Sequence, residues 1–116
     1  MDDEPIIRQT FELTLSKMGH QAATVATGQD ALRAYRQAKE SGEPFDLVIL
    51  DLTIPGGMGG RDTLAALRNY DAKVAAVVMS GYTDDEVMRD YAANGFKDAL
   101  PKPFTIDMVD RVINAT

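Results

Sequence analysis

The 116-residue sequence contains no cysteine and no tryptophan, and aromatic residues make up only 7% of it. The lack of cysteine excludes disulfide bridges and thiolate metal sites, and it suits a reducing cytoplasm, where we expect the protein to be located. Basic residues number 12 against 18 acidic ones, for a net charge of −6, so binding to nucleic acid is not expected. No hydrophobic run approaches the roughly 20 residues of a membrane-spanning helix, so no membrane contact is expected either.

Short hydrophobic runs alternate with segments of helical spacing along the whole chain. No repeat or linker divides the sequence, so we expect a single domain over residues 1–116. The predicted strands lie near residues 22–26, 45–50, 74–79 and 98–100. Helices are predicted near 5–18, from 27 or 28 to about 40, after 60, over 84–94 and over 106–114. This alternation favours an α/β fold with a parallel sheet and helices on both faces.

Three polar residues stand at the carboxyl ends of predicted strands: Asp51, Ser80 and Lys102. In an open parallel sheet the carboxyl ends of the strands lie at one edge, and ligands bind beyond that edge. Asp2 and Asp3 precede the first helix, at the point where a preceding strand would end. Clustered carboxylates favour a bound cation, and hard oxygen ligands suit Mg²⁺. An aspartate beside Mg²⁺ can attack phosphorus, while a lysine and a hydroxyl hold the phosphoryl oxygens.

Each of these residues also has an ordinary structural explanation when it is considered alone. The Asp2–Asp3 pair can complement a helix dipole, and Asp51 can cap a helix or form a turn. Ser80 precedes a glycine, as in many turns, and Lys102 can be an exposed loop lysine. Only their joint placement at successive strand ends favours a functional site.

The loop over residues 55–60 reads Pro-Gly-Gly-Met-Gly-Gly and raises the alternative of a phosphate cradle. It lacks the Gly-Lys-Ser/Thr ending of a P-loop, because Arg61 and Asp62 follow it. A dinucleotide-binding pattern that begins at Gly57 also fails, since Asp62 stands where the third glycine is required. We therefore predict a flexible loop that flanks the acidic site.

Together these motifs resemble the receiver domains of two-component signalling over essentially the whole chain. The matching residues, in order and spacing, are Asp2-Asp3, Glu4-Pro5, Asp51, Pro55, Ser80-Gly81 and Lys102-Pro103-Phe104. The resemblance implies a flavodoxin-like, doubly wound sheet of five parallel strands in the order 2-1-3-4-5. Because the acidic pair directly follows Met1, the central first strand is expected to be largely missing. Absent upstream residues, a strand donated by another chain and a rearranged sheet would each explain this, and we favour the first.

The resemblance also implies a chemistry for the predicted site. Asp51 would accept a phosphoryl group from a phosphohistidine of a histidine kinase or a histidine phosphotransfer domain. Mg²⁺ would be held by Asp3, Asp51 and the backbone carbonyl of Thr53, with Asp2 acting through water. The domain would also catalyse its own phosphorylation and dephosphorylation.

Lys102 would pair with the phosphoryl oxygens, and the Ser80 hydroxyl would bond to one of them. Receivers often carry an aromatic switch residue where this chain has Ala99, so coupling through a swinging ring is not expected here. Tyr82 occupies a position that influences the access of water to the aspartyl phosphate. We predict that its bulk shields that group.

The glycine-rich loop after Asp51 is similar to that of receivers attached to hybrid histidine kinases. This implies a piece of a larger sensor kinase, whose receiver would lie in the cytoplasm. A homodimer through the last helix and the helix after Ser80 stays open. Two other functions remain: a receiver-like interaction module that takes no phosphate, and an aspartate-dependent phosphatase. The phosphatase pattern would require a second aspartate where Thr53 stands.

Overall fold

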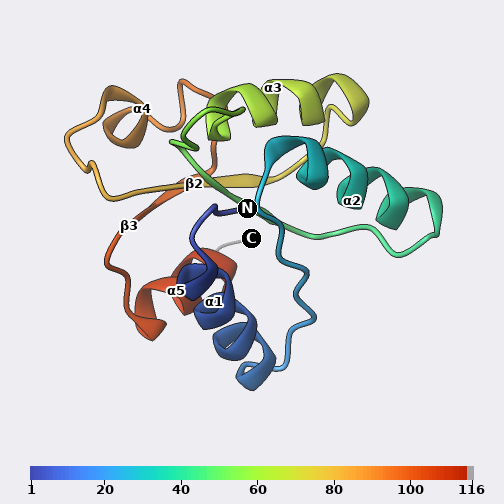
Figure 1. Cartoon of the computed structure of the whole chain (residues 1–116), viewed down its shortest axis with the longest axis horizontal. Helices are drawn as coiled ribbons and strands as arrows, with labels where there is room; N and C mark the ends of the chain where they lie inside the picture. The colour runs from blue at the N-terminus through green and yellow to red at the C-terminus, as the bar shows by residue number, and fades with distance from the viewer. Residues whose placement is uncertain (115–116) are drawn as a thin grey trace.

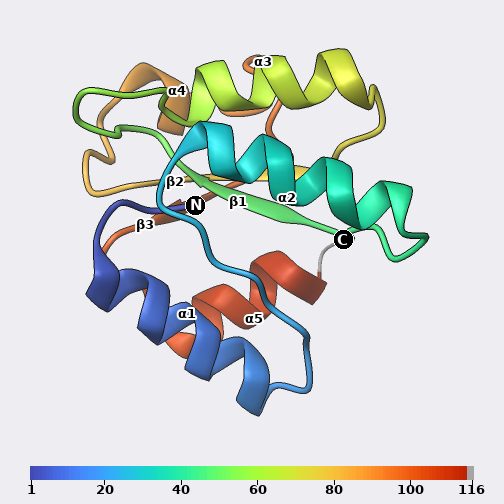
Figure 2. The same cartoon turned by 45° about the vertical axis from the view of Figure 1, so that its right-hand side comes forward.

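In the computed structural model, which describes residues 1–114, helices cover both faces of a central parallel sheet (Figures 1 and 2). The strands are β1 (Val48–Asp51), β2 (Ala76–Ser80) and β3 (Asp98–Pro101). The helices are α1 (Pro5–Lys17), α2 (Gly28–Glu40), α3 (Gly60–Tyr70), α4 (Glu86–Arg89) and α5 (Ile106–Asn114). Helices α2, α3 and α4 lie on one face of the sheet, and α1 and α5 lie on the other. The predicted α/β class is confirmed.

The sheet has the order β1-β2-β3, and both strand pairs are parallel. Leu50 of β1 lies opposite Val78 of β2, which in turn lies opposite Ala99 of β3. Every residue of β2 is buried, because this strand has a neighbour on each side and helices on each face. Such a strand requires the continuous hydrophobic run that predicted it.

The sheet of the described residues has three strands, whose order β1-β2-β3 agrees with the last three strands of the predicted order 2-1-3-4-5. The strand expected near residues 22–26 does not form, while Met1 and Asp2 take the place of a first strand. The Met1 ammonium donates to the Ile49 carbonyl at 2.7 Å, and the Asp51 N–H donates to the Met1 carbonyl at 3.0 Å. On the other side, the Asp2 N–H donates to the Val25 carbonyl at 3.1 Å. A single hydrogen bond does not form a ladder between strands, so residues 22–26 stay irregular.

Local signals set the helix ends. Pro5 occupies the first position of α1, and Gly19 follows that helix with a φ of 88°. The Thr27 side chain accepts a hydrogen bond from the Asp30 N–H and so caps α2, which begins at Gly28, within the predicted range. These three residues mark helix ends, and the first two helices were predicted from them.

Helix α4 is shorter than the predicted helix over 84–94. The Asp85 side chain caps it by accepting from the Val87 N–H, but only four residues are helical. The chain then continues in tight turns, with the Gly95 N–H bonded to the Ala92 carbonyl. These turns bring Phe96 into the core, where it is 2% exposed. The burial of that ring therefore overrides the helical spacing.

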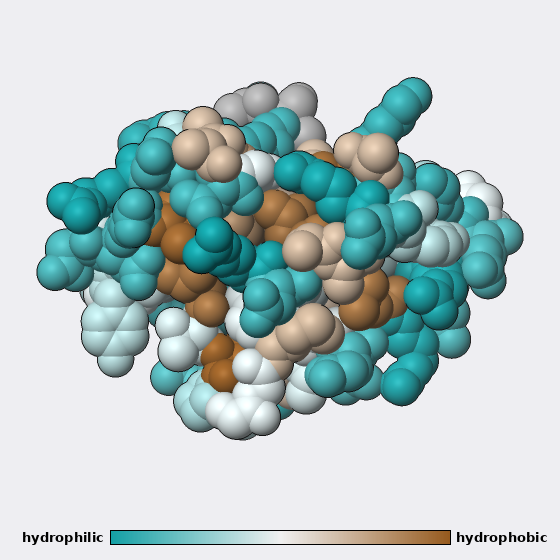
Figure 3. Space-filling view, turned by 90° about the horizontal axis from the view of Figure 1, so that it is seen from above, coloured by the Kyte–Doolittle hydropathy of each residue, from teal (hydrophilic) through white to brown (hydrophobic). Residues whose placement is uncertain are grey.

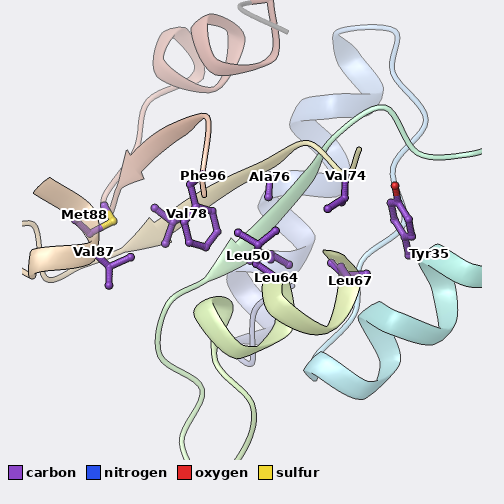
Figure 4. Close-up of a cluster of buried hydrophobic side chains, with 10 residues drawn as sticks. All are labelled: Tyr35, Leu50, Leu64, Leu67, Val74, Ala76, Val78, Val87, Met88 and Phe96. Atoms are coloured by element: carbon purple, nitrogen blue, oxygen red, sulfur yellow. The ribbon is translucent and has the colours of Figure 1, made fainter. Parts of the chain in front are cut away.

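Two hydrophobic clusters lie on opposite faces of the sheet. Figure 4 shows the cluster under α2, α3 and α4, which includes Tyr35, Leu50 and Val78. The other cluster joins Phe11 of α1 to Val77 and Met79 of β2 and to α5.

On the outside, hydrophilic side chains cover most of the face seen in Figure 3. None of the helices within residues 1–114 has the length and hydrophobicity to cross a membrane.

A polar contact joins α2 to the end of α3. The Tyr35 hydroxyl donates to Oδ2 of Asp71 at 2.7 Å, and the Lys39 ammonium lies 3.0 Å from the same oxygen. Burial and the neighbouring Asp71 raise the pKa of Tyr35 to about 12. The bonds from Tyr35 and Lys39 lower the pKa of Asp71 to about 2. This contact fixes the outer edge of the cluster in Figure 4.

Candidate functional site

Three aspartates meet at the carboxyl edge of the sheet. Asp51 is the last residue of β1, and Asp2 and Asp3 lie directly before α1. One carboxylate oxygen from each lies within 4.8 Å of the others. Asp2 is 2% exposed and Asp51 is 5% exposed, whereas Asp3 is exposed to solvent. The predicted carboxylate cluster is therefore present, with two of its members buried.

Lys102 reaches this cluster from the end of β3. Its ammonium nitrogen lies 2.7 Å from Oδ2 of Asp2 and donates a hydrogen bond to Oδ2 of Asp51 at 3.1 Å. Burial raises the pKa of Asp51, and the ammonium of Lys102 opposes that shift. Burial acts to lower the pKa of Lys102, but the two carboxylates outweigh it and raise the value. The lysine thus serves as the counter-ion of two buried acids.

Backbone and side-chain donors orient the acids. Oδ1 of Asp2 accepts from the Glu4 N–H at 2.9 Å, and Oδ1 of Asp51 accepts from the Thr53 N–H at 3.3 Å. The Arg8 guanidinium donates to the Asp2 carbonyl at 2.9 Å. Arg8 was not among the residues predicted for the site, although its position one turn into a helix that begins at Pro5 could have indicated it. Burial also lowers the pKa of the Met1 amine to about 6.

Ser80 ends β2, between the strands that supply Asp51 and Lys102. It is 2% exposed, and its Oγ accepts from the Tyr82 N–H at 2.9 Å. The Lys102 N–H donates to the Ser80 carbonyl at 2.9 Å, so the loops after β2 and β3 are joined at their starts. The Tyr82 side chain is 68% exposed. Ala99 is partly buried and contributes only a methyl group beside the hydrophobic cluster.

The glycine-rich loop packs against the backbone that follows Asp51. A Cβ at Gly59 would lie 2.3 Å from the Leu52 carbonyl oxygen, and one at Gly60 would lie 2.8 Å from that of Asp51. The Gly60 N–H donates to the Leu52 carbonyl at 3.2 Å. Glycine is therefore required where α3 begins, because the chain passes too close to Asp51 for a side chain.

The acidic cluster fits a divalent cation of the Mg²⁺ type. Its donor atoms are carboxylate oxygens, which this hard ion prefers. Oδ2 of Asp2 is buried and, apart from its ion pair with the Lys102 ammonium at 2.7 Å, has no hydrogen-bond partner within residues 1–114. The Thr53 peptide lies beside Asp51, since its N–H bonds to that carboxylate. Asp2, Asp3 and Asp51 are thus suited to hold the ion.

This fold and site define a doubly wound α/β protein with an acidic pocket at the carboxyl ends of its strands. Residues 1–114 match the family model of the response regulator receiver domain. The chain belongs to this family, whose members bind Mg²⁺ in an acidic pocket and act in two-component signalling.

Several curated relatives align with nearly the whole chain. The transcriptional regulatory protein KdpE of Mycobacterium tuberculosis is 36% identical over 107 residues, which are 92% of this chain and 44% of KdpE. The chemotaxis protein CheY of Bacillus subtilis is 30% identical over 116 residues, which are 100% of this chain and 92% of CheY. The chain thus spans less than half the length of KdpE and nearly all of CheY.

Solved structures show the same fold. Chemotaxis protein CheY4 of Vibrio cholerae superposes with a TM-score of 0.86 at 27% identity, covering 98% of this chain and 92% of that one. The receiver domain of the sensor histidine kinase PA1611 of Pseudomonas aeruginosa has a TM-score of 0.84 at 20% identity, covering 99% and 91%. That structure is described with a magnesium ion coordinated in its active-site cleft. The flavodoxin-like receiver fold predicted from the sequence is confirmed.

Proposed function

We propose that this chain is a phosphoacceptor receiver and that Asp51 is the residue that takes the phosphoryl group. The observation that supports this most strongly is the position of the Asp51 carboxylate at the end of β1. Two further acids lie beside it, and Lys102 donates to one of its oxygens. A nucleophilic carboxylate, a cation site and a lysine are the groups that transfer to an aspartate requires.

In the transfer, an Asp51 oxygen attacks the phosphorus of a phosphohistidine. A new oxygen–phosphorus bond forms as the bond between phosphorus and the imidazole nitrogen breaks, and the electron pair stays with the imidazole. Mg²⁺, when held by Asp3, Asp51 and the Thr53 carbonyl with Asp2 acting through water, supplies positive charge to the phosphoryl oxygens. Lys102, which follows β3 at the same edge of the sheet, supplies a second positive charge.

Ser80 is suited to respond to the new group. Its Oγ already accepts from the Tyr82 N–H, so its hydroxyl hydrogen is free to point toward a phosphoryl oxygen. A phosphoryl group adds a charge close to −2, which draws hydrogen-bond donors toward Asp51. The loop after β2 would move with Ser80 and carry the exposed Tyr82 toward the phosphoryl group. This movement would be the conformational signal.

We further propose that residues 1–116 act as one receiver module of a hybrid sensor kinase. The sensor histidine kinase GacS of Pseudomonas protegens is 28% identical over 97% of this chain, which matches 12% of GacS. The glycine-rich loop supports the same origin. The phosphoryl donor would then be the histidine kinase itself or a histidine phosphotransfer domain.

Incubation with a small-molecule phosphodonor and Mg²⁺ tests the phosphoacceptor role. Intact mass spectrometry should show one added phosphoryl group on the parent chain and none on Asp51→Asn. No modification of either chain would favour a receiver-like interaction module. Rapid release of phosphate over many turnovers would instead favour a phosphatase.

A further inference from the structure

Asp3 is the acid of the cluster that is held by no contact of its own. Asp51 ends a strand and bonds to Lys102, and Asp2 is paired with the same lysine. Asp3, by contrast, is exposed, and among residues 1–114 neither its side chain nor its backbone makes a hydrogen bond or an ion pair. Its carboxylate nevertheless has an oxygen within 4.8 Å of the other two acids. Other residues must therefore set its position.

The chain bends at Asp3 as it passes from the sheet edge into α1 (Figure 2), and contacts hold the peptide groups on both sides of that bend. The peptide group after Asp3 contains the Glu4 N–H, which donates to Oδ1 of Asp2 at 2.9 Å. The peptide group before Asp3 contains the Asp2 carbonyl, which accepts from the Arg8 guanidinium at 2.9 Å. Each peptide group is planar, so fixing both planes fixes the two backbone angles of the residue between them. Those angles set the direction of the Asp3 side chain.

Arg8 is the sole donor to the Asp2 carbonyl within the described part of the chain. It lies at the end of the first turn of α1, and its own N–H bonds to the Glu4 carbonyl at 3.2 Å. Helical side chains tilt toward the helix N-terminus, so a long one at this position reaches back over the segment that leads into α1. A positive charge near a helix N-terminus opposes the helix dipole. The contact with Asp2 therefore accounts for an arginine that the helix itself does not favour.

We infer that Arg8 is a positioning residue, which holds the peptide group between Asp2 and Asp3 and so keeps the Asp3 carboxylate beside Asp51. The inference rests on the cation site of the proposed function and adds to it a residue that does not itself bind the ion. Groups that hold metal ligands in place contribute roughly 10–100-fold to metal affinity. Arg8 acts in this way through the backbone and not through its charge.

The sign of the effect on Mg²⁺ binding separates the two roles. A positive charge near the acidic cluster repels Mg²⁺, so removing Arg8 would tighten binding if its charge alone mattered. If Arg8 positions Asp3, its removal frees one of the three carboxylates to move away from the others, and binding weakens. The two roles thus predict opposite results for the same variant.

Three variants of the full chain test the inference. Arg8→Met removes the donor and the charge, Arg8→Lys keeps a charged donor, and the control Arg33→Met removes an arginine whose side chain is 69% exposed on α2. Without metal, the NMR order parameter of the Asp3 amide reports directly on the peptide group that Arg8 holds. It should be about 0.85 in the parent, in Arg8→Lys and in Arg33→Met, and below about 0.6 in Arg8→Met.

Calorimetric titration with Mg²⁺ measures the consequence for the site. The dissociation constant should rise about tenfold in Arg8→Met and stay within about threefold of the parent value in Arg8→Lys. Arg33→Met should bind Mg²⁺ like the parent. Rescue by lysine, which restores a donor of similar reach, identifies the hydrogen bond to the Asp2 carbonyl as the source of the effect.

Three results would overturn the inference. An Asp3 order parameter that is equal in Arg8→Met and the parent would show that Arg8 does not hold this peptide group. A loss of order along the whole of α1 would show a role in helix stability only. Mg²⁺ binding that is unchanged or tighter in Arg8→Met would exclude positioning of a ligand. None of these readouts involves phosphate, so their failure is distinct from a failure of Asp51 to accept a phosphoryl group.

Discussion

The ammonium nitrogen of Lys102 lies 2.7 Å from Oδ2 of Asp2, a residue that precedes it by 100 positions and comes from the opposite end of the chain. The same ammonium lies 3.1 Å from Asp51. One cation therefore balances two buried carboxylates. A divalent cation that binds to the same acids competes with it for Asp2.

Replacing this lysine should destabilise the protein in a way that Mg²⁺ relieves. In Lys102→Met two buried carboxylates lose their counter-ion, which should cost about 1–3 kcal/mol of unfolding free energy at neutral pH. Added Mg²⁺ should restore more stability to the variant than it adds to the parent. Denaturant unfolding with and without Mg²⁺ measures both effects. Lys97→Met, at an exposed position, is the matched control, and equal behaviour of the two variants would contradict the prediction.

Replacing Gly59 with alanine should lower the stability of the protein, whereas the same change at Gly57 in the same loop should not. Gly59→Ala places a Cβ against the Leu52 carbonyl oxygen and should cost about 1–3 kcal/mol. Gly57→Ala meets only Ile54 at 3.5 Å, so it should change stability by less than about 0.5 kcal/mol. Urea unfolding of the two variants decides the point, and similar midpoints would show that the loop relaxes without cost.

The contact between Tyr35 and Asp71 should make stability depend on pH at both extremes. The pKa of Asp71 is lowered to about 2 from 3.8, so its contribution is present above pH 3.8 and is lost as the pH falls toward 2. The pKa of Tyr35 is raised to about 12 from 10, so its contribution is present below pH 10 and is lost as the pH rises toward 12. Tyr35→Phe should therefore flatten both slopes of unfolding free energy against pH. Tyr82→Phe, at an exposed tyrosine, should leave both slopes as they are. Parallel curves for Tyr35→Phe and the parent would refute this.

Tyr82 should lengthen the life of the phosphorylated state. If its ring shields the phosphoryl group from water, Tyr82→Ala should shorten the lifetime several-fold and Tyr82→Phe should preserve it. Loss of the phosphoryl group after removal of the donor, followed by mass spectrometry, gives the rate. An unchanged lifetime in Tyr82→Ala would remove the shielding role.

The sequence predicted those parts of the fold that depend on local patterns. The hydrophobic runs ending at Asp51 and Ser80 are strands because burial on both faces requires continuous hydrophobic residues. Pro5 and Thr27 mark helix starts because their effects act within one turn. The approach of Asp2, Asp51 and Lys102 was predicted from the rule that parallel strands end at one edge. These features need no knowledge of distant contacts.

What the sequence did not reveal depends on tertiary partners. The segment over 22–26 has the composition of a strand but lacks a neighbour along most of its length, so it stays irregular. Helix α4 ends early because Phe96 must reach the core. The bond from Tyr35 to Asp71 joins residues 36 positions apart, and no local pattern reports such a pair.

The most direct test of the phosphoacceptor role is to locate the phosphoryl group within the chain. After transfer from a phosphorylated histidine phosphotransfer domain in the presence of Mg²⁺, peptide mapping should place it on Asp51. Asp51→Asn should carry none, while Asp46→Asn, an exposed acid near the start of β1, should be labelled like the parent. Equal labelling of Asp51→Asn, or a phosphoryl group on any other residue of the parent, would contradict the proposed role of Asp51.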